Sequence, residues 1–432
     1  MEEKVEFYKE TEFKDTEIGR IPKEWEVVNL GSIAKISSGN TAPQEEKYFK
    51  NGKYPFIRVQ HLKELQEEKF PVNYDFVNDY ALSELKLKLF KKGCIVFPKS
   101  GESIKLEKRA MLKEDSCVVN HLAVIEPLYE NIDNLFLFYY LCTIKTSNYL
   151  TETTMPSLNL STISNFLVPL PSLIEQQRIA EILSTVDKAI QKTNDIIAKT
   201  ERLKKGLMQE LLTKGIGHKE FKDTEIGKIP KEWEVVNLEG ACVEITDGSH
   251  WSPKQVERSE YRIATVANLR ETYIDIDSCK FISEEDYMRL VKEGDVPRKD
   301  DILFSKDGTV GITFTFKQDF YKIGLLSSIA IIRPNHEFLF SDFGAYALKS
   351  PNILMQITGW KTGTALRRIT LDNLKRLKIM LPPLQEQQKI AEILSTVDKK
   401  LETLKQEKVK LERIKQWFME ELLSGRIRVR VA

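Results

Sequence analysis

Two long stretches of the chain carry apolar residues at alternating intervals of three and four positions, over residues 179–211 and 390–422. This spacing is sustained over about five heptads and predicts two long helices that pair through a narrow apolar seam, as in a coiled coil. We expect these spacer helices at residues 173–214 and 384–424. The predicted seam consists of thirteen residues: Ile179, Leu183, Val186, Ile190, Ile197, Leu207, Ile390, Leu394, Val397, Leu401, Leu404, Leu411 and Phe418.

Polar residues within these stretches refine the prediction. Lys204 and Lys415 occupy the same seam position in the two stretches. A polar residue in an apolar seam helps to fix the register of paired helices. Glu175 and Glu386 lie in the first turn of each predicted helix, where a carboxylate suits the positive end of the helix dipole.

The segments before the two stretches have a different pattern. Short apolar runs such as YPFIRV and DDILF are bounded by Gly, Pro, Asn and Asp, with helical stretches between them. This pattern predicts short strands joined by turns. Because the runs come in the same order in both segments, we expect two α+β domains of one fold, at residues 12–172 and 220–383.

Two blocks of sequence occur twice. EFKDTEIGRIPKEWEVVNL at 12–30 returns at 220–238, and EQQRIAEILSTVDK at 175–188 returns at 386–399, each with a single Arg-to-Lys exchange. The chain is therefore a tandem duplication of one unit of roughly two hundred residues, which is a whole domain and not a short solenoid repeat.

The lengths of these parts constrain how the helices pair. A helix of about 40 residues is ~60 Å long, whereas a domain of about 160 residues has a radius of gyration near ~15 Å. The second domain cannot easily bridge two points 60 Å apart, so we expect the helices to pair antiparallel, with pseudo-twofold symmetry. The alternative is that each helix packs on its own domain.

The two copies are nearly identical at their ends and differ in their middles. This contrast is expected if the ends bind two copies of one partner while the middles bind two different targets. A recent duplication is the alternative, but it would have left the middles alike as well. Trp25 and Trp233 lie in the identical blocks, so we interpret them as core or partner-facing residues.

Composition excludes several classes of protein. Lys plus Arg (65) nearly cancels Asp plus Glu (64), so a polyanionic partner would require basic side chains gathered on one face. The first residues, MEEKVEFYKE, lack the basic and apolar regions of a signal peptide, so we expect no export, and the longest apolar run, LFLFYYLC, is too short to span a membrane. We expect a cytoplasmic protein whose five scattered cysteines are reduced and mostly buried.

Motifs typical of enzymes are missing from the sequence. It contains no GxxxxGK[ST] loop, no NPPF or NPPY tetrapeptide and no HExxH, and its five histidines are scattered. We predict a non-catalytic chain with no cofactor and no metal.

Several segments together resemble the specificity subunit of type I restriction-modification systems. These are the paired [RK]IPKEWEVVNL entries, DGSHWSP, DILFSKDGTVG, GTALRRITLDNLKRLKIMLPPLQEQQKIAEIL and the helix ending ELLSGRIRV. The resemblance covers Phe13 to Gly425. It implies two target recognition domains that each read half of a bipartite, asymmetric site on double-stranded DNA, two bound methyltransferase (M) subunits, and a restriction and translocation (R) subunit that can join them.

A glycine turn in each copy is a candidate for DNA contact. In the second copy, FSKDGTVG offers free N–H groups beside a cation, which suits a phosphate or a base edge; an ordinary hairpin turn is the alternative. The turn residues are Lys306, Asp307, Gly308 and Thr309 in the second copy, with Lys99, Ser100 and Gly101 of PKSGES at the equivalent place in the first.

Further candidates lie in the second copy. Arg367 and Arg368 precede a predicted helix, and arginine can pair two-pronged with guanine or phosphate. Thr362 lies in the same glycine-containing segment, and His250 and Trp251 follow the turn TDGS. The first copy has Pro156 and Ser157 in place of the two arginines, a difference expected of domains that read different bases.

Two other functions remain open from the sequence alone. One is a coiled-coil adaptor or scaffold that binds proteins and not DNA. The other is a free-standing DNA-binding regulator.

Overall fold

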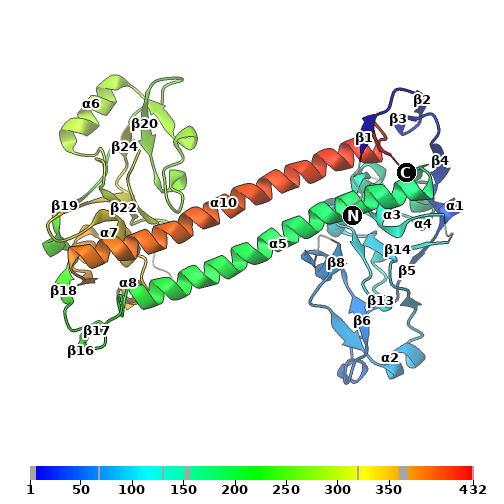
Figure 1. The fold of residues 1–432 in the computed structure, drawn as a ribbon, viewed down its shortest axis with the longest axis horizontal. Helices are drawn as coiled ribbons and strands as arrows, with labels where there is room; N and C mark the ends of the chain where they lie inside the picture. Colours follow the sequence, from blue (N-terminus) through cyan, green and yellow to red (C-terminus); the bar gives the residue numbers. More distant parts are fainter. Residues whose placement is uncertain are drawn as a thin grey trace. The chain divides into compact units, whose positions relative to one another are not determined.

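The computed structural model describes residues 6–66, 69–128, 131–150, 156–318, 321–359 and 368–430. The chain divides into two compact units: the first comprises Met1–Ile197 with Leu404–Ala432, and the second comprises Ala198–Thr403. Two long helices, α5 (Leu173–Leu211) and α10 (Leu384–Leu423), are continuous, and each contributes to both units (Figure 1).

A four-stranded antiparallel sheet forms the centre of each unit. Its strand order is β5-β14-β11-β12 in the first unit and β19-β25-β22-β23 in the second. The strands are β5 (Ala34–Ser38), β11 (Ile95–Pro98), β12 (Ala110–Met111), β14 (Leu122–Pro127), β19 (Cys242–Asp247), β22 (Ile302–Ser305), β23 (Thr313–Thr315) and β25 (Ile329–Pro334). The same order at the same places in the two copies confirms that both adopt one α+β fold.

A second sheet in each unit includes one parallel pair. This pair is β6·β13 in the first unit and β20·β24 in the second. The first sheet has the order β10-β13-β6-β9 and the second β21-β20-β24. Their strands are β6 (Tyr54–Ile57), β9 (Asp75–Val77), β10 (Leu89–Phe90), β13 (Ser116–Val118), β20 (Tyr261–Ala264), β21 (Lys280–Ile282) and β24 (Lys322–Leu325).

Two-stranded ladders complete the strands. The pairs are β1 (Phe7–Lys9) with β27 (Ile427–Val429), β2 (Phe13–Thr16) with β3 (Gly19–Pro22), β4 (Glu26–Asn29) with β15 (Leu167–Leu170), β7 (Leu65–Gln66) with β8 (Phe70–Pro71), β16 (Phe221–Thr224) with β17 (Gly227–Pro230), and β18 (Glu234–Asn237) with β26 (Lys378–Leu381). Hairpins β2–β3 and β16–β17 have the same register, as their nearly identical sequences predict.

The shorter helices lie within the two globular regions. They are α1 (Leu30–Ile33), α2 (Asp79–Glu84), α3 (Asn134–Thr143), α4 (Leu160–Ser164), α6 (Glu284–Glu293), α7 (Ser341–Ala347), α8 (Pro351–Gly359) and α9 (Leu371–Lys375). Helix α3 is apolar on nearly all sides and begins where the Asp133 side chain accepts hydrogen bonds from the backbone N–H groups of Leu135 and Phe136. Such a helix is stable because it is buried.

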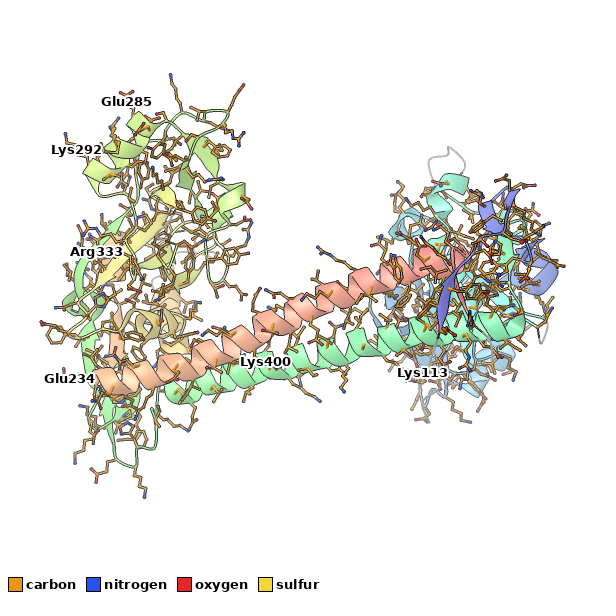
Figure 2. The ribbon with its side chains drawn as sticks, turned by 45° about the horizontal axis from the view of Figure 1, so that its top comes forward. Lys113, Glu234, Glu285, Lys292, Arg333 and Lys400 are labelled. Carbon is orange, nitrogen blue, oxygen red and sulfur yellow. The ribbon has the colours of Figure 1, made fainter. Side chains whose placement is uncertain are left out.

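Charged residues in the second unit lie beside groups of opposite charge. Arg333 lies on β25 (Figure 2). It is half-buried and forms a two-pronged ion pair with the buried Asp301, with nitrogen–oxygen distances of 3.0 Å. On α6, Glu285 and Lys292 are exposed at opposite ends of the helix, each at the end whose partial charge it complements (Figure 2).

The long helices run antiparallel within each unit and also pack on the globular region. In the first unit, Ile179 near the start of α5 shares an apolar core with Leu422 near the end of α10 and with Trp25. In the second unit, Ile390 of α10 shares a core with Leu211 of α5 in the same way. The predicted antiparallel helices are confirmed. The alternative, that each helix packs on its own domain, is also partly true, because the first turns of each helix belong to a domain core.

None of the thirteen predicted seam residues is exposed, since each is buried or half-buried. Some, such as Leu183 and Leu394, lie in the domain cores. Direct contact between the two helices at these thirteen positions therefore remains a prediction.

Gly206 offers a test of helix stability. It lies inside α5, is exposed, and a Cβ added there would meet no atom within 4 Å. Because glycine costs about 1 kcal/mol relative to alanine in a helix interior, we expect Gly206→Ala to raise the melting temperature of the full chain. The control is Gly240→Ala. Gly240 lies outside the long helices, and a Cβ added there would also meet no atom within 4 Å, so we expect no rise in melting temperature in the same thermal scan. A lower melting temperature for Gly206→Ala would show that the helix has a special need for glycine.

Candidate nucleic-acid interface

Equivalent segments lie at one end of the central sheet in both units. In the second unit they are the end of β19, the turn after β22 and the segment at Arg368. Backbone bridges join Asp307 to Arg368 in this unit and Ser100 to Ser157 in the first. Segments distant in sequence are thus held together by backbone pairing, independently of the side chains presented there.

A glycine after the edge strand is required in both units. A Cβ at Gly39 would lie 1.7 Å from the carbonyl oxygen of Val118, and a Cβ at Gly248 would lie 2.3 Å from that of Leu325. Backbone atoms cannot yield to such an overlap. The sequence analysis missed these residues, although aligning SSGN with TDGS would have placed a glycine at the same position in both copies.

Lys306 has a different role from the one predicted. Its side chain is 2% exposed, and its Nζ lies 2.8 Å from Oδ2 of the buried Asp247. Its backbone N–H donates to the carbonyl of Ser328, and its own carbonyl accepts from the N–H of Ile369. Lys306 therefore does not present its charge at the surface of the turn, because a buried ammonium needs a carboxylate partner; the residue anchors the turn.

The residues after Lys306 form an exposed turn. Gly308 and Thr309 are exposed, and Gly308 has a φ of +67°, a conformation that favours glycine. The Ser305 hydroxyl donates to the carbonyl of Thr309 at 2.6 Å and accepts from the N–H of Ile312 at 2.8 Å. These bonds hold the turn in one arrangement, with Gly308 and Thr309 at the surface.

Arg368 and His250 flank this turn. The Arg368 side chain is 60% exposed, and its Nε lies 3.3 Å from Oδ1 of Asp307. His250 is exposed, and its Nε2 lies 3.2 Å from the same buried Asp247 that binds Lys306. The structure thus brings these predicted residues together. Thr362 and Arg367 lie outside the described residues.

Trp251 points to a neighbouring cluster. Its Nε1 donates to the Glu293 carboxylate at 2.8 Å, and the Arg289 guanidinium lies 4.1 Å from its ring centroid. Both partners belong to α6, so Trp251 is held against that helix by a cation–π contact and a hydrogen bond. This packing gives Trp251 a structural role beside the turn.

The first unit presents different groups on the same backbone frame. Lys99 is half-buried, and its carbonyl accepts from the N–H of Leu158 at 2.8 Å, as that of Lys306 does from Ile369. Gly101, with a φ of +77°, donates its N–H to the carbonyl of Pro156. Ser100 Oγ lies 2.7 Å from Nδ1 of the exposed His121, a residue that the sequence analysis did not single out.

The duplicated blocks meet at the start of each long helix. Trp25 Nε1 donates to Glu175 at 3.1 Å, and Trp233 Nε1 donates to Glu386 at 3.0 Å. Glu175 also binds Arg428, at 2.6 Å to Nε and 2.9 Å to Nη2. Burial lowers the pKa of Arg428, but the hydrogen bonds and charges of its carboxylate partners outweigh this effect and hold the pKa above its usual range.

The glutamine next to each of these glutamates fastens a loop. The side chain of Gln176 accepts from the N–H of Asp133 and donates to the carbonyl of Pro171. Gln387 makes the equivalent bonds to Phe340 and Pro382. Part of the duplicated sequence is therefore explained by internal structure, because Trp–Glu pairs and loop-fastening glutamines are needed once per unit.

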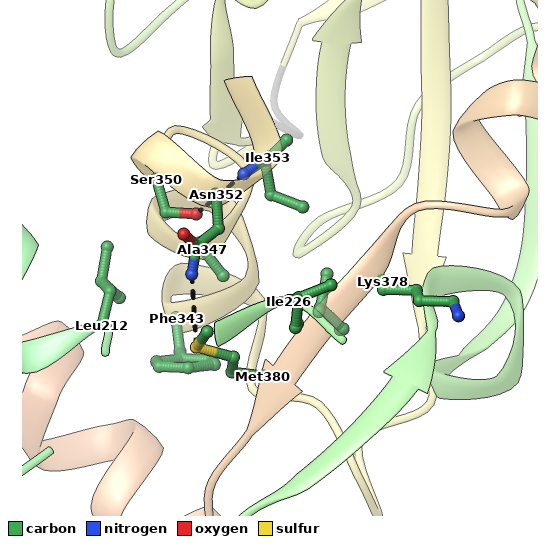
Figure 3. A pocket seen from close by; sticks show the side chains of 10 residues that line it. Leu212, Ile226, Phe343, Ala347, Ser350, Asn352, Ile353, Lys378 and Met380 are labelled. Atoms are coloured by element: carbon green, nitrogen blue, oxygen red, sulfur yellow. Dashed lines mark hydrogen bonds between the residues drawn. The ribbon is translucent and has the colours of Figure 1, made fainter. Parts of the chain in front are cut away.

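Two other features bear on chemistry. A cavity in the second unit, lined by residues that include Phe343, Asn352 and Met380, has a volume of about 10 Å³, room for about one water molecule (Figure 3). Among the described residues, no group of three or more His, Cys, Asp or Glu side chains is arranged to hold a metal ion, and no helix is both long and apolar enough to cross a membrane.

Comparison with known proteins identifies the family. The model of the type I restriction modification DNA specificity domain matches the chain twice, at residues 22–202 and 230–413. The chain belongs to this family. It is a specificity subunit of a type I restriction-modification system with two DNA specificity domains, as the resemblance implied.

Individual relatives agree with this assignment. The specificity subunit is 30% identical to the type I restriction enzyme MjaVIII specificity subunit of Methanocaldococcus jannaschii, with 99% of this chain and 98% of the relative covered. It is 21% identical to the EcoBI specificity subunit of Escherichia coli, with 85% and 77% covered.

Solved structures share the fold. The S subunit of a type I restriction-modification system from M. genitalium superposes with a TM-score of 0.58 at 15% identity, covering 92% of this chain and 96% of the other. A chain from a study of complex assembly and conformational transition of the type I R-M system gives a TM-score of 0.54 at 19% identity, covering 94% and 99%.

Proposed function

We propose that this specificity subunit reads a bipartite, asymmetric site on double-stranded DNA. Residues 12–172 and 220–383 each read one half-site, and the spacer helices at 173–214 and 384–424 set the gap between the halves. The observation that carries the proposal is the turn after β11 and after β22: one backbone frame presents Ser100 and His121 in the first unit but Thr309, His250 and Arg368 in the second. Different side chains on the same frame read different bases.

We assign the DNA contacts to residues of the two turns according to how exposed those residues are. Arg368, His250 and Thr309 carry groups that can bind phosphate oxygens or base edges, and Gly308 and Gly101 let the backbone approach closely. Lys306 and Asp307 hold the second turn, and Lys99 and Ser100 belong to the first. Thr362 and Arg367 remain candidates because they precede Arg368 in the sequence.

We also propose that the chain is non-catalytic and acts in the cytoplasm with two methyltransferase (M) subunits and a restriction and translocation (R) subunit. The exposed parts of the duplicated hairpins support a partner bound twice. Lys14, Asp15 and Glu17 recur as Lys222, Asp223 and Glu225. In the second unit, Lys222 and Asp223 are exposed. Exposed residues that recur in both copies suit one partner surface used twice.

Purification of the chain with the methyltransferase encoded beside it tests the proposal. We expect about two methyltransferases per chain, a stoichiometry set by the two copies of the repeated ends, and methylation confined to one bipartite sequence. Failure to form this complex, together with DNA affinity that ignores sequence, would favour the adaptor. Tight, site-specific binding by the chain alone would favour a free-standing regulator.

Arg368 gives a residue-level test. Replacing it with alanine should weaken binding to the half-site read by the second domain by about 1–3 kcal/mol, the usual cost of losing a two-pronged base contact. Recognition of the other half-site should be unchanged, because Arg368 belongs to one unit. The measurement is competition binding of the complex to duplexes mutated in one half at a time.

The control for this test is Arg413→Ala, which removes the same charge from an exposed position on α10. Any loss of DNA affinity caused by Arg413→Ala should be the same for all duplex sequences. Equal effects of the two substitutions on both half-sites would contradict a reading role for Arg368.

A further inference from the structure

One buried carboxylate in the first unit joins three parts of the fold. Asp187 of α5 is fully buried, and its Oδ2 accepts a hydrogen bond from the Tyr139 hydroxyl of α3 at 2.6 Å. Its Oδ1 lies 2.6 Å from Nζ of Lys415 on α10. Lys69, buried in the same domain as Tyr139, lies 3.4 Å from Oδ2. The carboxylate therefore ties the globular domain and the facing helix to α5 at once.

The second unit contains the same joint, built from the other copy. Asp398 of α10 accepts from the Tyr346 hydroxyl of α7 at 2.7 Å through Oδ2. Its Oδ1 lies 2.6 Å from Nζ of Lys204 on α5. In both joints the tyrosine hydroxyl thus contacts one carboxylate oxygen and the lysine contacts the other. Lys349 of this domain lies close enough that the charges of Lys204 and Asp398 affect its pKa, which burial lowers to about 8.

The positions of the charged residues allow a single register. Asp187 and Asp398 each lie twelve residues after the first glutamate of the duplicated EQQ block. On each helix the aspartate and the lysine are seventeen residues apart, from Asp187 to Lys204 and from Asp398 to Lys415. One antiparallel alignment of α5 with α10 therefore satisfies both ion pairs, whereas a slip in either direction breaks both.

An apolar seam alone does not fix this alignment. Leucine and isoleucine side chains can repack after a shift of one heptad, and a polar residue in the seam is the usual device that selects one register. The buried Asp187 is more restrictive than an amide would be, because loss of its cation leaves a charge in a poorly solvated site; Asp398, at 18% exposed, is under the same constraint to a lesser degree. The tyrosine hydroxyl adds a second constraint, since it binds the domain to the same carboxylate.

We infer that Asp187 and Asp398 are positioning residues for DNA recognition, each locking one recognition domain to the facing helix through a tyrosine on the domain and a lysine on that helix. The inference rests on the proposed reading of a bipartite site. According to this inference, the two joints restrict the gap between the half-sites to a narrow range of lengths. The length of the helices sets only the mean gap length.

A measurement without DNA tests the joints directly. Spin labels on non-natural side chains at the exposed positions Tyr80 and Met288 report the spread of distances between the two domains by pulsed electron resonance. We expect a narrow distribution for the full chain in its complex, and a distribution at least about twice as wide for the Lys204→Met, Lys415→Met double variant, which breaks both ties to the facing helix. The control is Lys205→Met with Lys410→Met, exposed lysines on the same two helices, which should leave the width unchanged.

A second measurement uses the methyltransferase complex and duplexes whose gap varies one base pair at a time between fixed half-sites. The native complex should methylate one gap strongly, and the double variant should spread its activity over neighbouring gaps while the bases read in each half stay the same. A purely structural defect would lower methylation at every gap in proportion. If the lysine variant does not fold, Tyr139→Phe with Tyr346→Phe, which keeps the ion pairs, should give a smaller change in the same direction.

The outcomes separate this inference from the proposed function. Unchanged widths and an unchanged gap preference in folded variants would overturn the inference, as would a native distribution as broad as that of the variant. A widened distribution in a complex that methylates no bipartite site would support the joints and refute the proposed function.

Discussion

Replacing Glu175 by alanine is expected to destabilise the first unit by about 3 kcal/mol, at the lower end of the cost of removing one partner from a buried ion pair. Glu175 is buried and accepts hydrogen bonds from both Trp25 and Arg428. Arginine cannot lose its charge, so its guanidinium would keep only Glu10 and Glu24 as partners. The effect should be read from urea unfolding together with hydrogen exchange of the β1–β27 ladder.

The second unit supplies a matched comparison. Glu386→Ala removes the acceptor of Trp233 and of His218, whose Nε2 lies 2.9 Å from Oε1. We expect a smaller loss than for Glu175→Ala, because the Glu386 side chain is 14% exposed and that of Glu175 only 4%. Glu181→Ala, which removes a solvent-exposed carboxylate from the same helix as Glu175, should change stability by no more than about 0.5 kcal/mol. A loss for Glu175→Ala as small as that for Glu181→Ala would contradict the anchoring role.

Deleting one heptad from each long helix is expected to shorten the preferred gap between half-sites by about three base pairs. Seven residues of helix span ~10.5 Å, and the rise of DNA is ~3.4 Å per base pair. The deletions should remove residues 192–198 and 403–409, which lie between the aspartate and the lysine of each helix. Because both intervals shrink equally, both ion pairs can still form, and the heptad phase is kept.

The control for this prediction deletes residues 192–198 alone. One antiparallel register can then no longer satisfy both Asp–Lys pairs, so we expect loss of the narrow gap preference and not a shift of it. Methylation of duplexes with graded gaps provides the measurement for both variants. A paired deletion that keeps the original gap would show that the helices do not set it.

The large features of the fold could be predicted because the sequence contains its own comparison. Two duplicated blocks and two sustained heptad patterns specified two similar α+β regions and two long helices, and simple lengths favoured antiparallel pairing. These signals are strong because a strict repeat is required along a helix seam. The predicted bounds were close as well, with α5 beginning at Leu173 and α10 at Leu384.

The partners of the charged residues could not be predicted in the same way. The seam position of Lys204 and Lys415 was evident, but their pairing with Asp398 and Asp187 depends on the register. Glu175 and Glu386 were interpreted through the helix dipole, whereas in the structure each accepts a hydrogen bond from an indole N–H group 150 or more residues away in the chain. Such contacts between distant segments leave no local pattern.

The candidate DNA site was predicted only in part. The turn at Gly308 and Arg368 were separate candidates in the sequence, and the structure places them side by side through a backbone bridge. Their contact with DNA stays a prediction. The burial of Lys306 could not be anticipated, because its partner Asp247 lies on a different strand. His121 was overlooked because VNHLAV reads as a strand, and its exposure depends on where that strand begins.

The most direct test of the account is methylome sequencing of cells that express this chain with its methyltransferase. The account predicts one methylated motif in two parts, with different bases in the two halves and a gap of constant length. A continuous motif, two identical halves, or methylation without any sequence preference would contradict it.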